Sequence, residues 1–480
     1  MAESPHLVAA DRRAFVLESL LAVPVGLLGG SASALFLWAL DRVTAARWQQ
    51  PWLLWFLPAV GFAVGWLYHR FGRSAERGTH LILEQIRTPG TGVPLRMAPL
   101  VLLGTLATHL CGGSAGREGT ALQMGASLAS ELARRCELSV ASARILLLAG
   151  VAAGFGSVFG TPLAGAVFAL EVLALGRLRY RALVPLLLAS MVGHLTCLAW
   201  GTQHTAFVIN RSDPARLYAA LDLTLIAQIA GAAVVFGLVS RGFTAGIHTL
   251  QAAFARWVAY APLRPAIGGA LVVGLVFATG HRDYLGLGVS SPDPAAVTLL
   301  SAFNPGGAHD WSWAGKSLFT IVTLGSGFKG GEVTPLFFIG ATLGHVLAGF
   351  GHVPVDLFAG LGLIAVFAGA TKTPCNHPSL RPSISADPSG PLNAVVTNSK
   401  FSNCCAMTRL SLVARSLLNM AIIKSTSDVP CIELCCAIDC PIIRNIMLFP
   451  EPLGPTIKLC DGLSTCGNSE KISTKRLCAS

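Results

Sequence analysis

One acidic residue, Glu118, stands inside a glycine-rich turn between two apolar runs, Met97–Cys111 and Ala121–Leu132. The turn reads GGSAGREGT over residues 112–120. Glycines let the backbone bend so that several amide N–H groups face one point at a helix start, where the partial positive charge of the helix favours an anion. A carboxylate in so apolar a region is costly to bury and indicates a functional site. The turn therefore predicts an anion site that involves Glu118; the alternative is that Glu118 only pairs with Arg117 or caps the helix.

A second glycine-rich break occupies residues 324–335 and precedes another apolar run. When the two breaks are laid over each other at one constant offset, Gly116 aligns with Gly331, and the segment Gly125–Leu128 aligns with Gly340–Leu343. Paired broken helices at matching positions of two halves indicate a transporter site near the bilayer midplane. The two breaks are therefore predicted to form one site together, although glycine-rich membrane helices can also resemble one another by chance.

The composition predicts a membrane protein. The 480 residues are 53% hydrophobic and 12% charged, with a mean hydropathy of +0.61, whereas soluble domains have about twice that charged fraction. Apolar stretches at or near bilayer-spanning length recur at Phe15–Leu40, Trp52–Tyr68, Ala182–Trp200, Leu221–Val239 and the shorter Pro265–Thr279. We expect a multi-pass protein whose residues 1–14 form a cytoplasmic N-terminus by the positive-inside tendency. Basic loops that face anionic lipid explain the net charge of +11, so no nucleic-acid partner is expected.

Both breaks carry residues that resemble the signatures of the CLC family of chloride channels and proton-coupled anion antiporters. Residues 116–119 match its G-K/R-E-G-P signature with threonine in place of proline, and residues 330–335 match its G-G-x-F-x-P signature with Val333 in place of phenylalanine. The first family signature, G-S-G-I-P, is absent where residues 78–82 stand. The resemblance covers residues 15–374 and implies an all-α, CLC-like inverted repeat of short, tilted and broken helices. It also implies a homodimer with one pore per subunit in the plasma (inner) membrane.

The departures from these signatures resemble the fluoride-exporting branch of the family. That branch shares the GREGT turn and the run GFKGGEVTP of residues 327–335, but it typically has asparagines where Thr79 and His80 stand. It also lacks the internal proton-carrying glutamate of chloride/proton antiporters; in this sequence Val172 takes that position and Glu171 lies one place early. The resemblance implies proton-coupled fluoride export, with chloride/proton exchange or a voltage-gated chloride channel as alternatives.

The resemblance also implies roles for the residues of the two breaks. Glu118 would be the gating and proton-carrying glutamate, whose ionised carboxylate occupies an anion site and whose protonated form leaves it. The expected contributors to the anion site are Gly116, Arg117, Gly119, Thr79, Glu332, Val333 and Thr334. Amide dipoles and helix ends can bind fluoride or chloride without a fixed cation that would trap the ion. Anions, protons, the bilayer and a second subunit are the expected partners, and no metal or cofactor is expected.

The composition changes abruptly after Pro374. Ten of the 13 cysteines lie in residues 375–480, which contain neither Tyr nor Trp, whereas CLC chloride transporters place an anion-coordinating tyrosine in their last membrane helix. The cysteines of residues 431–440 lack the paired C-x-x-C spacing of structural zinc sites. We interpret this tail as a reading-frame error or gene fusion that replaced the closing helices, with a genuine soluble extension as the alternative. A disrupted gene would yield a transport-dead protein. An enzyme is disfavoured because no nucleophile–base motif or H-E-x-x-H pattern is present.

Overall fold

The computed structural model describes residues 5–88, 90, 92–173, 180–205, 223–351 and 353–371. Within these ranges the chain is helical and contains no strand, which confirms the predicted all-α class. The first half comprises α1 (Pro5–Gln49), η1 (Pro51–Phe56), α2 (Leu57–Phe71), α3 (Thr79–Arg87), α4 (Met97–Leu110), α5 (Glu118–Arg135), α6 (Val140–Phe159), α7 (Pro162–Leu173), η2 (Tyr180–Ala182) and α8 (Leu183–Ala199). The second half comprises α10 (Leu223–Trp257), α11 (Leu263–Thr279), η3 (Ser301–Phe303), α12 (Ser312–Gly325), α13 (Val333–Gly351) and α14 (Val355–Thr371).

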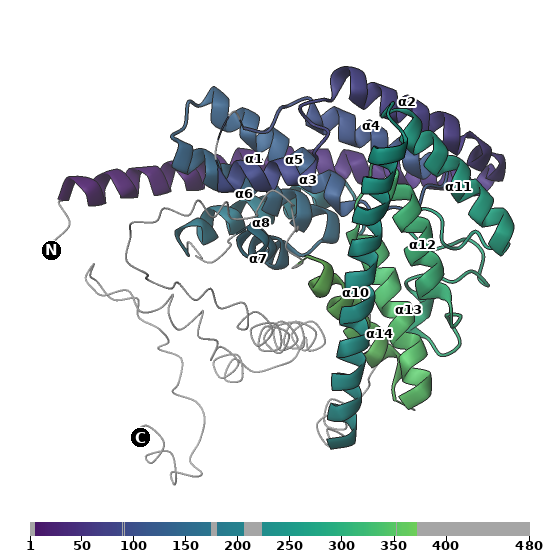
Figure 1. Cartoon of the computed structure of the whole chain (residues 1–480). Helices are drawn as coiled ribbons and strands as arrows, with labels where there is room; N and C mark the ends of the chain where they lie inside the picture. The colour runs from purple at the N-terminus through teal and green to yellow at the C-terminus, as the bar shows by residue number, and fades with distance from the viewer. Residues whose placement is uncertain are drawn as a thin grey trace, which may run out of the picture. The chain divides into compact units, whose positions relative to one another are not determined.

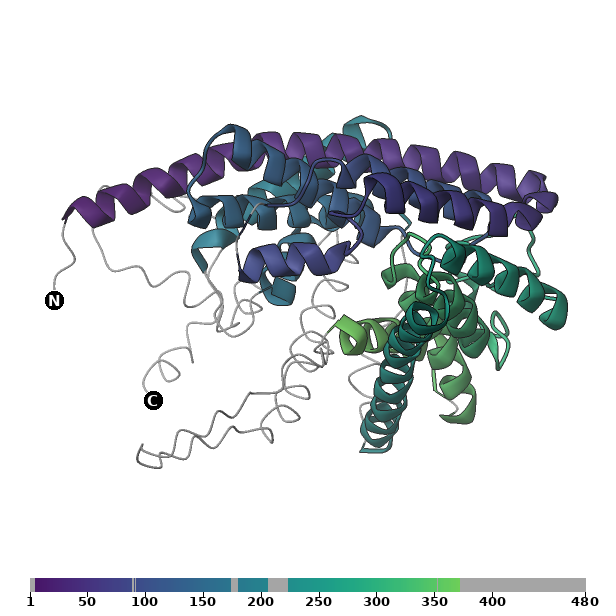
Figure 2. The same cartoon turned by 45° about the horizontal axis from the view of Figure 1, so that its top comes forward.

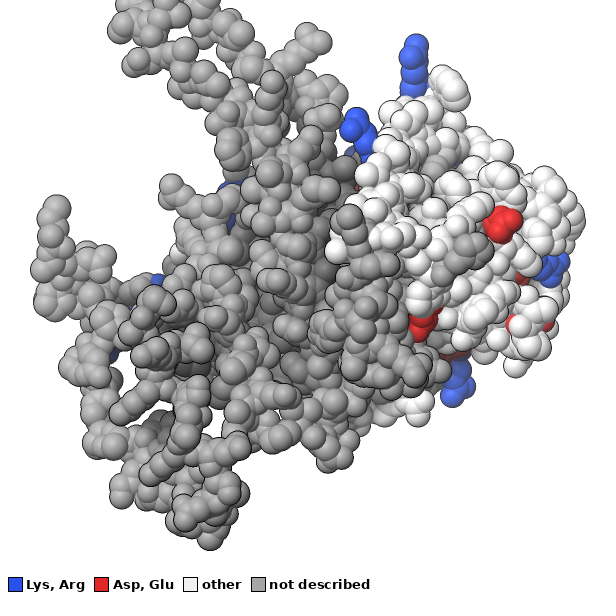
Figure 3. Space-filling model, turned by 90° about the horizontal axis from the view of Figure 1, so that it is seen from below, with Lys and Arg blue, Asp and Glu red and all other residues white. Residues whose placement is uncertain are grey.

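The helices have the lengths and surfaces expected of a membrane protein. Five of them are long and apolar enough to cross a bilayer, within Arg12–Gln49, Pro51–Phe71, Val140–Phe159, Thr224–Trp257 and Val333–Gly351. Others are apolar but shorter, among them α4, α8, α11 and α14. On the face seen in Figure 3 the described surface is mostly uncharged, with a few scattered charged side chains. A mixture of long and short apolar helices is what a broken-helix transporter fold requires.

Three pairs of helices repeat at one spacing. The helices α4, α5 and α6 begin at Met97, Glu118 and Val140, and α12, α13 and α14 begin at the same offset from them, at Ser312, Val333 and Val355. The helix α5 packs on α6, and α13 packs on α14. A Cβ on Gly125 would lie 2.2 Å from the carbonyl oxygen of Gly150, and a Cβ on Gly340 would lie 2.2 Å from that of Gly362. The repeat predicted from the sequence therefore recurs as a repeat of helix packing.

Long helices flank the short ones that carry the breaks. The helix α1 contacts α4, α5, α6 and α8, while α10 runs beside α12 and α14 in both cartoon views (Figure 1, Figure 2). The helix α1 begins at Pro5, so helical structure includes much of the segment predicted as a separate N-terminus. The long helices bury apolar surface against their own half and thereby hold the starts of α5 and α13 in place.

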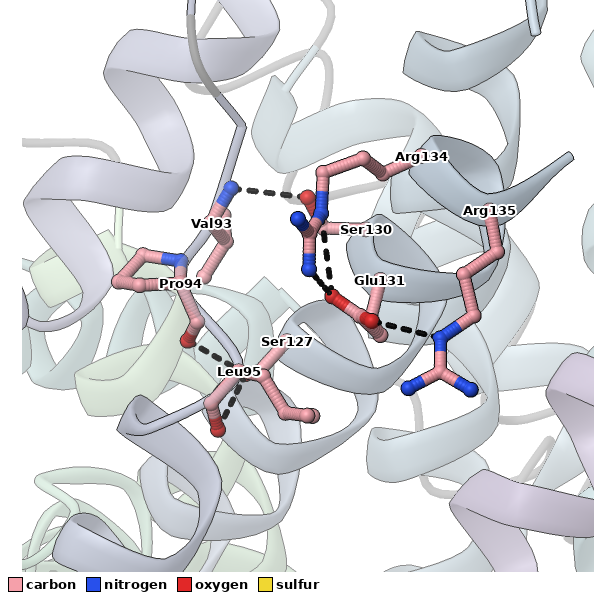
Figure 4. Close-up of polar contacts among 8 residues, drawn as sticks. All are labelled: Val93, Pro94, Leu95, Ser127, Ser130, Glu131, Arg134 and Arg135. Carbon is pink, nitrogen blue, oxygen red and sulfur yellow. Dashed lines mark hydrogen bonds and ion pairs between the residues drawn. The ribbon is translucent and has the colours of Figure 1, made fainter. Parts of the chain in front are cut away.

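The helix α5, which starts at the first break, is hydrogen-bonded through its second half to the segment that leads into α4 (Figure 4). The Ser127 hydroxyl donates to the carbonyl oxygens of Pro94 at 2.8 Å and Leu95 at 3.2 Å. The Ser130 hydroxyl accepts from the N–H of Val93 at 2.8 Å. These bonds satisfy backbone groups between helices and fix the axial position of α5.

Candidate functional site

The two glycine-rich breaks meet through their backbones, as predicted. The N–H of Gly116 donates to the carbonyl oxygen of Gly331 at 2.6 Å, and the N–H of Gly331 donates to that of Gly116 at 2.7 Å. These are the two glycines that the alignment of the breaks placed at equivalent positions. A reciprocal pair of bonds between equivalent residues is what a two-fold relation between the repeats produces.

The carboxylate of Glu118 lies across this junction. The residue is 1% exposed. Its Oε2 accepts from the N–H groups of Thr334 and Arg117, each at 3.1 Å, and its Oε1 accepts from the Thr334 hydroxyl. The Nε of Arg117 is 3.8 Å from Oε1, which is longer than a hydrogen bond. Glu118 therefore bonds to both repeats, and its ion pair with Arg117 is the looser contact.

The donors around Glu118 form a site suited to an anion. Thr334 is in the first turn of α13, where backbone N–H groups have no partner within the helix. The start of that helix also carries partial positive charge. In the present structure the Glu118 carboxylate accepts these donors.

The glycines of the junction are required by close contact. A Cβ on Gly116 would lie 2.8 Å from Oε2 of Glu118, and one on Gly330 would lie 2.4 Å from the Cβ of Ala115. A Cβ on Gly119 would lie 3.2 Å from the Cα of Gly331. Larger side chains would separate the two breaks and displace the donors from the carboxylate.

Of the other predicted site residues, Val333 lies at the junction, whereas Thr79 lies away from the carboxylate. Val333 is the first residue of α13 and precedes Thr334, so its backbone belongs to the junction. The side chain of Glu332 is exposed. The Thr79 hydroxyl accepts from the Nε2 of Gln123 at 3.3 Å, and among the described residues it makes no hydrogen bond to Glu118. Thr79 contacts α5 farther along the helix than its first turn, and a direct role for its hydroxyl at the carboxylate stays a prediction.

Two predictions concern parts of the chain outside the described residues. The first is the absence of an internal proton carrier, since the side chains of Glu171 and Val172 are not among those described. The second is the nature of the tail at residues 375–480.

A buried polar network behind the junction was not predicted. The Ser114 hydroxyl and the Thr320 hydroxyl are 2.9 Å apart, and the N–H of Ser114 donates to the Thr323 hydroxyl at 3.1 Å. The ring Nε2 of His109 lies 3.1 Å from the carbonyl oxygen of Ala115. These contacts tie the first break to α12 and to the end of α4. Buried polar groups need hydrogen-bond partners. The polar residues within these apolar helices were therefore the sequence signal that could have predicted this network.

Known proteins resemble this chain in sequence and fold. Residues 60–376 match the family described as voltage gated chloride channel. The chain is 48% identical over 360 residues to the chloride/fluoride channel protein of Pseudomonas syringae pv. tomato, which covers 74% of this chain and 76% of that protein. The chain belongs to the CLC family. As a CLC protein, it is a member of a class of multi-pass membrane proteins that transport anions.

Other CLC proteins support the same assignment. The crystal structure of a CLC-type fluoride/proton antiporter matches with a TM-score of 0.69 at 33% identity, over 78% of this chain and 89% of that one. The structure of a slow cyanobacterial Cl−/H+ antiporter matches with a TM-score of 0.58 at 20% identity, over 74% and 88%, and supports the fold alone. The putative chloride channel protein ClcB-like of Ralstonia nicotianae is 28% identical over 357 residues, 69% of this chain and 77% of that protein. The predicted family and fold are confirmed.

Proposed function

We propose that this CLC protein exports fluoride in exchange for protons, with Glu118 as gate and proton carrier. The observation that carries the proposal is the position of the Glu118 carboxylate, which accepts hydrogen bonds from Arg117 in one repeat and Thr334 in the other. An ionised carboxylate that satisfies these donors excludes another anion from them.

Protonation of Glu118 is the proposed step that opens the site. An ionised carboxylate only accepts hydrogen bonds, whereas a protonated one carries a donor and no charge. Charge-assisted bonds are roughly twice as strong as neutral ones, so protonation weakens the hold of Thr334 and Arg117 on the side chain. The neutral side chain then leaves, and an anion accepts the same donors. Loss of the proton restores the charge, and the returning carboxylate displaces the anion, which couples the two ions.

Two observations favour fluoride over chloride. Thr334 offers a hydroxyl in addition to its N–H, and a small, strongly hydrated anion needs many donors to replace its water. The relative at 48% identity is named a chloride/fluoride channel protein, and the structure at 33% identity is described as a fluoride/proton antiporter. Chloride/proton exchange and passive chloride conduction remain the alternatives.

Reconstituted vesicles test the proposal directly. We expect vesicles loaded with fluoride to release it faster than matched vesicles release chloride, with proton uptake that follows fluoride release. Equal or faster chloride release would assign the protein to the chloride branch of the family. Anion release without proton movement would make it a channel. No release of either ion by folded, inserted protein would support the transport-dead alternative.

We also infer a homodimer in the plasma membrane, as the family resemblance implies. The helix α8 exposes Val184, Leu188, Met191 and Leu195 at helical spacing, an apolar face suited to lipid or to a second subunit. Light scattering of the detergent-solubilised protein should give twice the subunit mass of 50.1 kDa. Fractionation should recover the protein with the plasma membrane. A monomeric mass in several mild detergents would contradict the dimer.

A further inference from the structure

A second cationic region lies where α1 ends. A cavity of about 200 Å³ opens there, and its lining includes Arg47, Gly112, Arg282, Asp283, Gly288 and Ser290. If the N-terminus is cytoplasmic, as predicted, this end of α1 faces the outside. Gly112 belongs to both the cavity and the turn that leads to Glu118, so the cavity adjoins the proposed anion path.

Arg47 is one of two arginines that line this cavity. Its Nε is buried and makes no hydrogen bond within the described part of the chain. Its guanidinium carbon lies 5.9 Å from the centre of the Trp48 ring. A Cβ on Gly286 would lie 3.3 Å from Nη2 of Arg47, so the glycine leaves room for the guanidinium. Arg47 therefore offers donors that no described side chain or backbone group uses.

A second buried cation approaches the same glycine. Lys316 is 0% exposed, and its ammonium donates to the carbonyl oxygens of Gly286 at 2.7 Å and Tyr284 at 3.1 Å. The ammonium also lies 5.5 Å from the centre of the Phe338 ring. Among the described residues no carboxylate forms an ion pair with Lys316 or with Arg47.

Two acids, Asp283 and Asp293, also line the cavity, and each accepts a hydrogen bond from a backbone N–H. Asp283 accepts from the N–H of Val297 at 3.2 Å, and Asp293 accepts from the N–H of Ala295 at 2.9 Å. A buried arginine donor without a partner is unfavourable in an apolar protein. A mobile anion in the cavity would accept this free donor of Arg47.

We propose that this cavity is a second anion site, in which the Arg47 guanidinium holds a small monovalent anion. The inference rests on the proposed function for the identity of the anion, fluoride or chloride. In that role the cavity concentrates the anion beside the turn at Gly112, before or after it passes Glu118.

Calorimetric titration of the purified full chain with sodium fluoride and sodium chloride tests the site at alkaline pH, where an ionised Glu118 holds its own donors. Arg47→Gln should weaken anion binding by about tenfold or more, the size of one charge-assisted hydrogen bond. Arg47→Lys keeps the charge and should lose less. Asp283→Asn keeps an acceptor for the N–H of Val297 but removes a negative charge, so it should tighten binding.

Arg73→Gln serves as the matched control, because Arg73 is an exposed arginine outside the cavity whose one hydrogen bond within the described part of the chain goes to a backbone carbonyl. It should leave anion binding unchanged. Melting temperatures in detergent identify variants that fail to fold.

Unchanged binding in Arg47→Gln, or weaker binding in Asp283→Asn, would overturn the inference. Binding that depends on Arg47 in a protein that transports no fluoride would contradict the proposed function and leave this site standing. Fluoride transport combined with anion binding that does not depend on Arg47 would contradict this site and leave the proposed function standing.

Discussion

At the scale of single residues, the interaction of Glu118 with both repeats makes a sharp prediction. Glu118→Gln should abolish proton coupling, because an amide imitates the protonated acid but has no proton to release. Anion movement should become independent of pH or stop. If Glu118 served only to pair with Arg117, the substitution would leave a partly buried cation unpaired, and the main effect would be a loss of stability, below the roughly 3–5 kcal/mol of a fully buried pair.

Proton and anion flux measured on the same vesicles, normalised to folded protein, separate these outcomes. Glu131→Gln is the matched control, since Glu131 lies on the same helix and binds the exposed Arg134 and Arg135 (Figure 4). It should leave coupling intact. Proton coupling that survives in Glu118→Gln would remove Glu118 from the mechanism.

Thr334 supports a second prediction at this scale. Thr334→Val removes the hydroxyl that binds Oε1 of Glu118 but keeps the backbone N–H that binds Oε2. Fluoride flux should fall by about tenfold, the effect of one hydrogen bond to an ion, and Thr334→Ser should restore most of it. Thr342→Val, in the same helix, removes a hydroxyl that among the described residues bonds to carbonyl oxygens of α13 alone, and it should leave flux unchanged. Equal flux in Thr334→Val and wild type would show that the hydroxyl does not bind the anion.

At the scale of elements, the glycine contact between α5 and α6 holds the start of α5 in place. Gly125→Ala would put a Cβ 2.2 Å from the carbonyl oxygen of Gly150, so the helices must separate. Overpacking of this kind costs about 1–3 kcal/mol, and we expect lower thermal stability in detergent and slower fluoride flux.

Gly274→Ala is the control for this prediction. Gly274 lies inside α11, and no atom of the described residues lies within 4 Å of the new Cβ, so alanine should raise stability by up to about 1 kcal/mol through its helix propensity. If the Gly125→Ala protein had the same melting temperature as wild type, the helix contact would tolerate a methyl group and would not set the position of α5.

At the scale of the whole molecule, the prediction concerns residues 375–480. We expect mild protease treatment of membranes to remove this tail and leave a fragment that spans the helices from α1 to α14. The reason is composition: the segment lacks the long apolar runs that would bury it in the bilayer or in a core. Mass spectrometry of the fragment checks the boundary. A tail that resists protease and binds zinc stoichiometrically would contradict the frame-error interpretation.

The sequence by itself determined the class of protein and the outline of its site. Apolar content, glycine-rich breaks and the recurrence of the first break in the second half are readable along the chain, because each break needs its own glycines to bend the backbone. The structure bears them out, since Gly116 and Gly331 meet through paired backbone bonds and α5 and α13 begin at matching positions.

Only the tertiary structure decided which groups meet. Glu118 bonds to Thr334 in the other half of the chain, whereas Thr79 bonds to Gln123 instead of the carboxylate. Arg47 and Lys316 approach the same glycine from different helices. The physical reason is that a hydrogen bond or an ion contact depends on distances of a few ångström, and helix packing, not spacing along the chain, sets those distances.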